Sequence, residues 1–521
     1  MLLVINAKIL GKDSLQGILI ENEKIKEIAD SKVLLSKYKN IKIYDAKAKR
    51  VIPGLNDSHL HLLGYAKLNR QLRLDSAKSI VEVIDLGRKY LKSNPNLGLL
   101  IGELYNDSNF LEKRIPNKED LDQISSTIPI IFSRVCGHIC TINSKAIELL
   151  NLDSSISIAG GSLDRIDGKL TGVLRENAMS LTDPLFNYEY TIVDYKELII
   201  EGIIAANKVG LTSLQVNDIS LSPIDEKKVF QAYKELAQAG KLNARINHQI
   251  TFANVDKLDN FLSTIDFEND YLRVGPLKLF IDGSLGAKTA ALFANYIDDN
   301  QNGIVCLNQE ELTNFVDYAT KNNLQVIIHA IGDRGIKIVL DEFARVNQGE
   351  NINRNGIVHV QITSRDLLAR FEELQICTLV QPIFINTDMS IVYKRVSKDL
   401  ANTSYAFKTL FNNTKTSFGS DSPVESFNPF YGIYHAVTRK DLTGENIYIL
   451  EEAMSVNDAI KAYTENGAYM SFEETKKGKL EIGYFGDLVI LDQDPYSINL
   501  DKIKDIEVEC TIVGGRIVYE K

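Results

Sequence analysis

Residues 51–61 have the sequence Val-Ile-Pro-Gly-Leu-Asn-Asp-Ser-His-Leu-His, an apolar run that ends on two histidines separated by one residue. Side chains two positions apart on a β-strand point to the same side of it. His59 and His61 can therefore reach one metal ion together, while Leu60 faces the opposite side. Alone this pair is a weak signal, because two histidines at a surface or in a core would give the same pattern.

Three further residues that commonly bind metals also follow apolar, strand-like runs. They are His329 after residues 324–328, His359 after 356–358, and Asp421 after 416–420. The chain has only seven histidines, so the placement of four of them at such positions is a strong pattern. Imidazole nitrogen and carboxylate oxygen are common ligands of zinc and similar ions. The set predicts a metal site at the carboxyl ends of buried strands.

Strand-like and helix-like stretches alternate through the middle of the chain, which favours βα units and a parallel sheet. In a (β/α)₈ barrel the carboxyl ends of all strands meet at one face, where catalytic residues gather. We therefore expect an α/β protein built on a (β/α)₈, or TIM, barrel over residues 51–477. The candidate strands are Arg50–Leu55, Leu211–Val216, Ala244–Thr251, Leu277–Ile281, Gln325–Ile328, Gly356–Val358, Cys377–Gln381 and Thr416–Phe418.

Both chain ends and one long insertion lie outside this alternation. Residues 1–50 and 478–521 contain short strand-like stretches, and neither end has enough of them for a stable sheet of its own. We expect the two ends to combine into one composite β-sandwich. Residues 65–194 separate the first candidate strand from the second and far exceed an ordinary loop. They predict an insertion, or lid subdomain, within the barrel.

Lys278 lies inside a strand that is predicted to be buried. A buried lysine must be paired with an acid or be neutral, and Asp282 is a nearby pairing candidate. A neutral amine could instead take up carbon dioxide to form a carbamate. Such an anion could bridge two divalent ions at the usual two-metal spacing and offset their repulsion.

Composition narrows the classes of function and partner. The 521 residues carry a formal net charge of −10, which argues against nucleic acid or an anionic membrane as the main partner. The sequence has no apolar run of membrane-spanning length and no secretory signal pattern at its start. Its five cysteines include no C-x-x-C pair. We expect a cytoplasmic protein that acts on a small molecule, and whether it forms a homodimer stays open.

As a set, the motifs resemble the amidohydrolase superfamily, specifically the amidohydrolase-3 branch that includes N-substituted formamide deformylases. The similarity runs nearly from end to end. The matching stretches are residues 51–61, Lys278-Leu-Phe-Ile-Asp-Gly-Ser-Leu-Gly, His329-Ala-Ile-Gly-Asp, Val358-His-Val-Gln, Ser417-Phe-Gly-Ser-Asp-Ser-Pro and residues 478–492.

The resemblance implies a site for two divalent ions, with zinc as the first expectation and manganese, iron or cobalt as alternatives. The ligands carried over by residue are His59 and His61 for the more buried ion, His329 and His359 for the second, Lys278 as the carbamate bridge, and Asp421. Asp421 is also the expected catalytic proton shuttle.

Other residues match the family less specifically. His138 ends Arg134-Val-Cys-Gly-His and Glu176 ends Thr171-Gly-Val-Leu-Arg-Glu, and both stretches resemble family motifs. These two residues are candidates for substrate binding. Residues that could orient the metal ligands, or equally cap helices, are Asp282, Asp333 and Gln381.

These expectations converge on a hydrolase that cleaves amide-type C–N bonds with a metal-activated hydroxide. The same site would also suit esters, cyclic imides or deamination, so the substrate stays open. A barrel kept only as a scaffold is a further alternative, although such a protein would be expected to have lost ligands.

Overall fold

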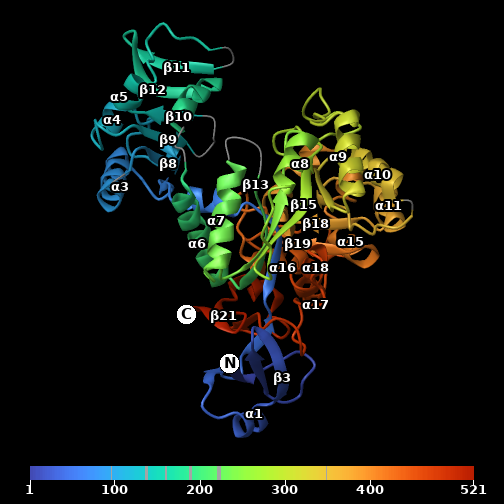
Figure 1. Cartoon of the computed structure of the whole chain (residues 1–521). Coiled ribbons are helices and arrows are strands. Elements are labelled where there is room, and N and C mark those ends of the chain that lie inside the picture. The colour runs from blue at the N-terminus through green and yellow to red at the C-terminus, as the bar shows by residue number, and fades with distance from the viewer. Residues whose placement is uncertain (96, 135–138, 159–160, 187–189, 220–224, 348) are drawn as a thin grey trace. The chain divides into compact units, whose positions relative to one another are not determined.

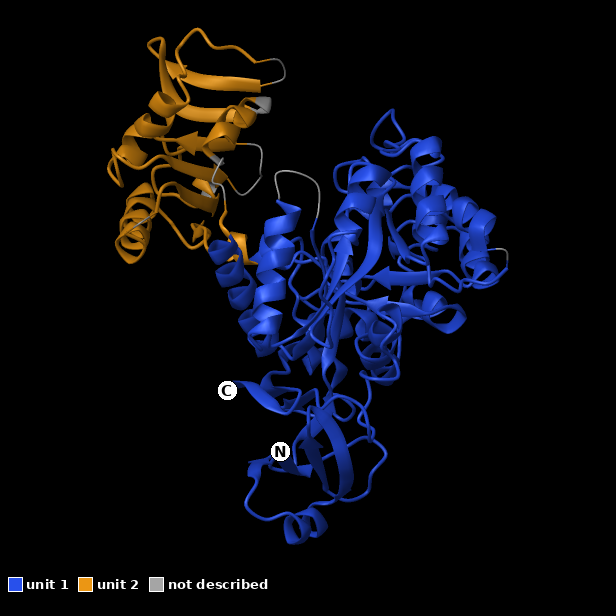
Figure 2. Ribbon diagram, viewed as in Figure 1, with its two compact units in different colours: residues 1–65, 192–521 blue, residues 66–191 orange. Residues whose placement is uncertain are grey.

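The computed structural model describes residues 1–521 except 96, 135–138, 159–160, 187–189, 220–224 and 348. The described residues form two compact units. One comprises Met1–Tyr65 with Ile192–Lys521, and the other comprises Ala66–Thr191 (Figure 2). Among the described residues, no helix has the length and apolar character needed to cross a membrane.

The larger unit contains a sheet of eight parallel strands (Figure 1). Along the sheet, each strand pairs with the next one in chain order, as the repeated βα unit requires. The strands are β6 (Leu55–Leu60), β13 (Leu211–Ile219), β14 (Arg245–Ile250), β15 (Leu272–Phe280), β16 (Val326–Ala330), β17 (Gly356–His359), β18 (Cys377–Val380) and β19 (Thr416–Phe418).

The prediction of a first barrel strand at Arg50–Leu55 is wrong. Residues Arg50–Pro53 form β5, which pairs with a C-terminal strand in a different sheet. The first barrel strand is β6, which begins at Leu55 after Gly54. The two short strands follow each other directly, and an apolar run does not show which sheet it will join. The other seven candidate strands overlap observed barrel strands.

The barrel is nearly closed where its first and last strands meet. Just beyond β19, the Asp421 N–H donates to the His59 carbonyl at 2.8 Å, and the His61 N–H donates to the Ser422 carbonyl at 2.7 Å. Gly419 is required at this seam, because a Cβ there would lie 2.7 Å from the backbone nitrogen of His59. The seam therefore places the first histidine pair beside Asp421.

Amphipathic helices with polar caps cover the barrel strands. The helix α9 (Gln309–Lys321), for example, buries Leu312, Phe315, Val316 and Ala319 on one face and is capped by the Asn308 side chain. The other helices of this region are α2 (Leu62–Asn69), α6 (Ile192–Lys208), α7 (Glu226–Gln238), α8 (Val255–Leu262), α10 (Asp333–Asn347), α11 (Arg365–Leu374), η3 (Pro382–Phe384), α12 (Ile385–Asp388), α13 (Val392–Arg395), α14 (Lys398–Ala401), α15 (Phe407–Asn413), α16 (Pro429–Thr438), η4 (Leu450–Glu452), α17 (Val456–Ala462) and α18 (Glu465–Met470).

Two four-stranded sheets contain both ends of the chain. The first has the order β3-β2-β1-β4 and the second β22-β21-β20-β5. One apolar core includes residues of both sheets, among them Val4 and Ile18 from the first and Leu488 and Ile512 from the second. The elements are β1 (Leu2–Ala7), β2 (Gln16–Glu21), β3 (Lys24–Asp30), α1 (Ser31–Lys37), β4 (Lys42–Asp45), β20 (Leu488–Leu491), η5 (Leu500–Asp505), β21 (Val508–Val513) and β22 (Arg516–Glu520).

The smaller unit, Ala66–Thr191, has a six-stranded sheet of its own with the order β11-β12-β10-β9-β8-β7. Its elements are β7 (Leu72–Arg73), α3 (Ile80–Ser93), β8 (Leu100–Tyr105), η1 (Asp107–Asn109), α4 (Lys118–Asp122), β9 (Ile130–Arg134), β10 (Ile139–Ile142), α5 (Ser144–Leu149), β11 (Gly161–Ile166), β12 (Lys169–Glu176) and η2 (Asn177–Phe186). The domain bounds expected from the sequence, 1–50 with 478–521, 51–477 and 65–194, stay predictions.

Candidate metal centre

His59, His61 and Asp421 converge at the carboxyl end of the barrel. Nε2 of His59 and Nε2 of His61 each lie 3.3 Å from Oδ1 of Asp421. The potential ligand atoms of all three residues lie within 4.8 Å of one another, so the group could hold a metal ion. The side chain of His59 is fully buried, and that of His61 is partly open.

The other two predicted histidine ligands continue the same cluster. The ring centroids of His59 and His359 are 5.9 Å apart, and those of His359 and His329 are 4.4 Å apart. The four rings thus form one series, with His61 beside His59 at 5.3 Å. Their strands, β6, β16 and β17, all end at the same face of a parallel barrel.

Every histidine of the cluster has one ring nitrogen next to a carbonyl oxygen. Nδ1 of His59 lies 2.5 Å from Oε1 of Gln249, and Nδ1 of His359 lies 2.8 Å from Oε1 of Gln381. Nδ1 of His61 lies 3.2 Å from the Asn217 carbonyl. Because a carbonyl oxygen only accepts, each of these nitrogens carries the hydrogen and leaves Nε2 as a lone pair.

His329 has the opposite arrangement. Its Nε2 lies 3.0 Å from the carbonyl oxygen of Gly283, so Nε2 donates and Nδ1 keeps the lone pair. Each of the four rings is therefore held in one tautomer by an oxygen on one side, which leaves one nitrogen of each ring able to bind an ion.

Burial keeps most of these imidazoles neutral. Burial, together with the charge of the nearby Lys278, lowers the pKa of His59 to about 4 and that of His329 to about 3. Burial also holds the pKa of His359 well below its usual range. Burial acts against charge on His61 too, but its contact with Asp421 outweighs this effect and raises the pKa.

Asp421 is charged in the same surroundings. Burial acts to raise its pKa, but the contacts with His59 and His61 prevail and hold the pKa well below the usual range. A carboxylate then faces the lone pair of neutral His59. Nε2 of His59 and Oδ1 of Asp421 meet as two acceptors without a hydrogen between them, and a cation there would turn their mutual repulsion into attraction.

Lys278 on β15 is completely buried. Its Nζ has no hydrogen-bond partner among the described residues and lies 4.0 Å from the centroid of the Phe280 ring. Burial lowers its pKa to about 7, while the charge of Asp421 acts in the opposite direction. The suggested pairing with Asp282 is not observed, because that carboxylate accepts instead from the N–H groups of Ala291, Ile331 and Gly332.

Two residues that orient the cluster were not singled out from the sequence. They are Gln249 and Asn217, on the neighbouring strands β14 and β13. A signal was available for Gln249: polar Arg245, Asn247 and Gln249 alternate with apolar or aromatic neighbours in a strand buried on both faces. The partner of Gln249 was not apparent, because His59 lies far away in the sequence.

Of the other candidates, Gln381 contacts His359 as described, and Asp282 lies 3.5 Å from Nε2 of His329. Asp333 begins α10 and accepts from the Phe293 N–H at 3.1 Å. His138 lies outside the described residues. Glu176 ends β12, where its backbone pairs with Gly161, and its side chain is not among those described.

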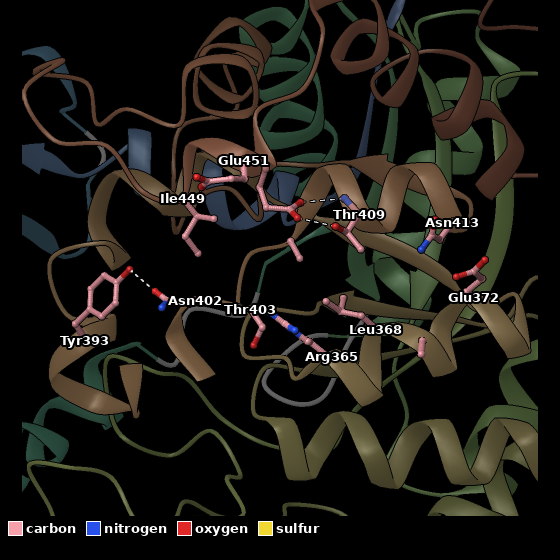
Figure 3. A pocket seen from close by; sticks show the side chains of 13 residues that line it. Arg365, Leu368, Glu372, Tyr393, Asn402, Thr403, Thr409, Asn413, Ile449 and Glu451 are labelled. Carbon is pink, nitrogen blue, oxygen red and sulfur yellow. Dashed lines mark hydrogen bonds between the residues drawn. The ribbon is translucent and has the colours of Figure 1, made fainter. Parts of the chain in front are cut away.

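A separate groove of about 700 Å³ lies on the barrel's outer side, between α11, α15 and η4 (Figure 3). Its lining includes Arg365, Thr409, Ile449 and Glu451, and none of the candidate metal ligands. Glu452 is not free to meet a ligand there, because it accepts from the Thr409 N–H and hydroxyl. The groove is therefore distinct from the histidine cluster.

The chain matches a known protein family over most of its length. The amidohydrolase family model matches residues 42–519, and the chain therefore belongs to the amidohydrolase family. This confirms the resemblance seen in the motifs.

Several relatives match over nearly their whole length. The chain is 30% identical to the putative amidohydrolase YtcJ of Bacillus subtilis over 98% of this chain and 97% of that protein. It is 23% identical to the N-substituted formamide deformylase of Arthrobacter pascens, over 100% and 98% of the two chains. The structure resembles that of an uncharacterized metal-dependent hydrolase from Pyrococcus furiosus, with a TM-score of 0.79, 30% identity and coverage of 95% and 100%.

Proposed function

We propose that this chain is a metal-dependent hydrolase that cleaves amide-type C–N bonds, other than peptide bonds, in a small molecule. The observation that carries the proposal is the convergence of the His59 and His61 nitrogens on the Asp421 carboxylate, with Nδ1 of both rings donating elsewhere. The similarity to a metal-dependent hydrolase and to a formamide deformylase supports the class of reaction.

The residues present suit two divalent ions. Zinc is the first expectation, and manganese, iron and cobalt are the alternatives. His59, His61 and Asp421 would hold one ion, and His329 with His359 would hold the second. Lys278 is suited to bridge them as a carbamate, since its buried Nζ lacks a partner among the described residues. In that reaction neutral Nζ forms a bond to the carbon of carbon dioxide and releases one proton.

Bound ions would supply a water of lowered pKa and would polarise the carbonyl group of the substrate. Asp421 is the proton carrier of the proposal. As the water oxygen bonds to the carbonyl carbon, the carboxylate of Asp421 accepts the water proton. It then returns this proton to the nitrogen as the C–N bond breaks, so that an acid and an amine leave.

The test begins with protein stripped by a chelator and reloaded with each metal in bicarbonate buffer. The substrates are N-substituted formamides and N-acyl amines, compared with lactones, cyclic imides and aminated heterocycles. We expect metal-dependent release of amine from the first two classes, and none with Asp421→Asn. Turnover of only the other substrate classes would show that the protein cleaves a different type of bond. A protein that binds no metal after reloading would support the alternative that the barrel is a non-catalytic scaffold.

The proposal includes an architectural part. The apolar core that includes Val4 and Leu488 supports one composite β-sandwich made from both chain ends. Limited proteolysis tests this: the N-terminal and C-terminal sheets should become protease-sensitive together, and independent loss of one end would contradict it.

A further inference from the structure

Two buried glutamines bind the histidine cluster in the same way. The Gln249 amide lies between the His59 ring and the Ser58 carbonyl, which accepts from its Nε2 at 2.8 Å. The Gln381 amide lies between the His359 ring and the Leu379 carbonyl, which accepts from its Nε2 at 3.0 Å. Both glutamine side chains are nearly inaccessible to solvent.

The backbone carbonyl in each arrangement fixes which end of the amide meets the histidine. If the Gln249 amide were rotated by half a turn, its Oε1 would face the Ser58 carbonyl, and two acceptors would meet. The same holds for Gln381 and the Leu379 carbonyl. Because a buried polar atom without a partner costs about 1–3 kcal/mol, the rotated state is disfavoured.

The fixed amide in turn selects one tautomer of the histidine. With Oε1 toward the ring, only a ring that carries its hydrogen on Nδ1 can form the bond. The lone pair of His59 is then on Nε2, toward Asp421, and that of His359 is also on Nε2. A charged partner would select the same tautomer, but a glutamine adds no net charge to this buried region.

We propose that Gln249 and Gln381 are positioning residues, each of which sets the tautomer of one histidine and so prepares one of the two ion positions. Gln249 acts through His59 for the position shared with His61 and Asp421. Gln381 acts through His359 for the position shared with His329. The assignment of each glutamine to one ion position rests on the proposed function, whereas the tautomers of His59 and His359 do not depend on it.

The direct test is the tautomer itself. Long-range proton–nitrogen NMR correlations on metal-free protein labelled with ¹⁵N-histidine, recorded at mildly alkaline pH, distinguish protonated from bare ring nitrogens. His59 and His359, assigned by single substitutions, should carry their hydrogen on Nδ1. An Nε2–H form of either ring in the wild-type protein would overturn the proposal, whatever the variants do.

The variants separate the two glutamines. Gln381→Met keeps the length of the side chain but removes the acceptor, and it should change the His359 signals while leaving those of His59. Gln249→Met should do the reverse. The matched control is Gln215→Met, a buried glutamine whose Nε2 donates to the Gly467 carbonyl and which should leave both rings unchanged.

Metal affinity provides the second readout. Loss of an orienting partner typically weakens metal binding 10–100-fold, so each Gln→Met variant should weaken one ion by about that factor in a competitive chelator titration. Gln→Glu keeps an acceptor oxygen toward the ring and should restore Nδ1–H, but its second oxygen faces the backbone carbonyl, so the affinity should be only partly restored. Equal weakening of both ions by one variant would overturn the separate assignments. Correct tautomers in a protein that binds no metal would instead contradict only the proposed function.

Discussion

Nε2 of His59 lies 3.3 Å from Oδ1 of Asp421, and the two atoms meet as acceptors because Nδ1 of His59 donates to Gln249. His59 lies in β6 and Asp421 follows β19, the two end strands of the barrel sheet, and the Asp421 N–H donates to the His59 carbonyl. A cation between the two acceptor atoms would offset their repulsion and so stabilise this arrangement.

Asp421→Asn should keep the fold and much of the metal but lose turnover. An amide oxygen can still bind an ion, whereas it cannot carry a proton at neutral pH, and such a proton carrier typically contributes 10²–10⁴-fold to rate. The measurement is kcat together with metal content. The control is Asp501→Asn on an exposed ion pair, and near-normal kcat in Asp421→Asn would exclude the shuttle role.

Lys278→Met should abolish carbamate formation and reduce the number of bound ions. ¹³C NMR in labelled bicarbonate should show a carbamate signal in the wild type and none in this variant. Lys477→Met is the matched control, because Lys477 is also buried but its Nζ pairs with Glu473 at 2.6 Å. A carbamate signal that persists in Lys278→Met, or that disappears in Lys477→Met, would contradict the assignment.

His248→Phe should make the protein less sensitive to acid. His248 packs edge-on against Tyr233, with no hydrogen-bond partner for its ring nitrogens among the described residues, and burial lowers its pKa to about 3. Since its unfolded pKa is about 6.5, the unfolded chain binds more protons between pH 6.5 and 3. Stability from this neutral ring is therefore lost as the pH falls through that range.

The size of this effect can be measured by urea unfolding at several pH values. The free energy of unfolding of the wild type should fall with decreasing pH more steeply than that of His248→Phe, by up to about 1.4 kcal/mol per pH unit. Phe261→Leu, which changes a buried aromatic residue without removing a titratable group or its partner, should retain the wild-type slope. Equal slopes for the wild type and His248→Phe would show that the ring does not titrate as expected.

Asp487→Asn should destabilise the fold strongly. Asp487 binds Arg245 of β14 through two contacts of 2.7 and 3.1 Å, and both side chains are buried. Removing one partner of a buried pair leaves an uncompensated charge and costs about 3–5 kcal/mol.

The control for this pair is exposed Lys440–Asp501, where loss of the acid should cost about 0–1 kcal/mol. Chemical unfolding of the two Asp→Asn variants measures both values. Similar values for Asp487→Asn and Asp501→Asn would mean that the buried pair has little structural role.

The sequence predicted seven barrel strands at nearly their observed places, because strands buried on both faces leave continuous apolar runs. The same rule misplaced the first strand. Arg50–Pro53 and Leu55–Leu60 are both buried, and only the partner strands distinguish the sheet of β5 from that of β6. A local sequence pattern does not show which strand a segment will pair with when the two are hundreds of residues apart.

A similar limit applies to the site. His59, His61, His329, His359 and Asp421 stood out because each follows an apolar run and has the chemistry of a metal ligand. Gln249 is not a typical metal ligand and lies within a buried strand, so its sequence context does not mark it as part of a site. Its role follows only from its distance to the His59 ring. Residues that act by orienting others become visible only in three dimensions.

The seam between β6 and β19 also bears on how the protein matures. His59 is synthesised near the beginning of the barrel and Asp421 near its end, so the two residues cannot meet until most of the chain has been made. If the chain binds metal as proposed, newly made protein should begin to take up metal only after its last barrel strand has docked.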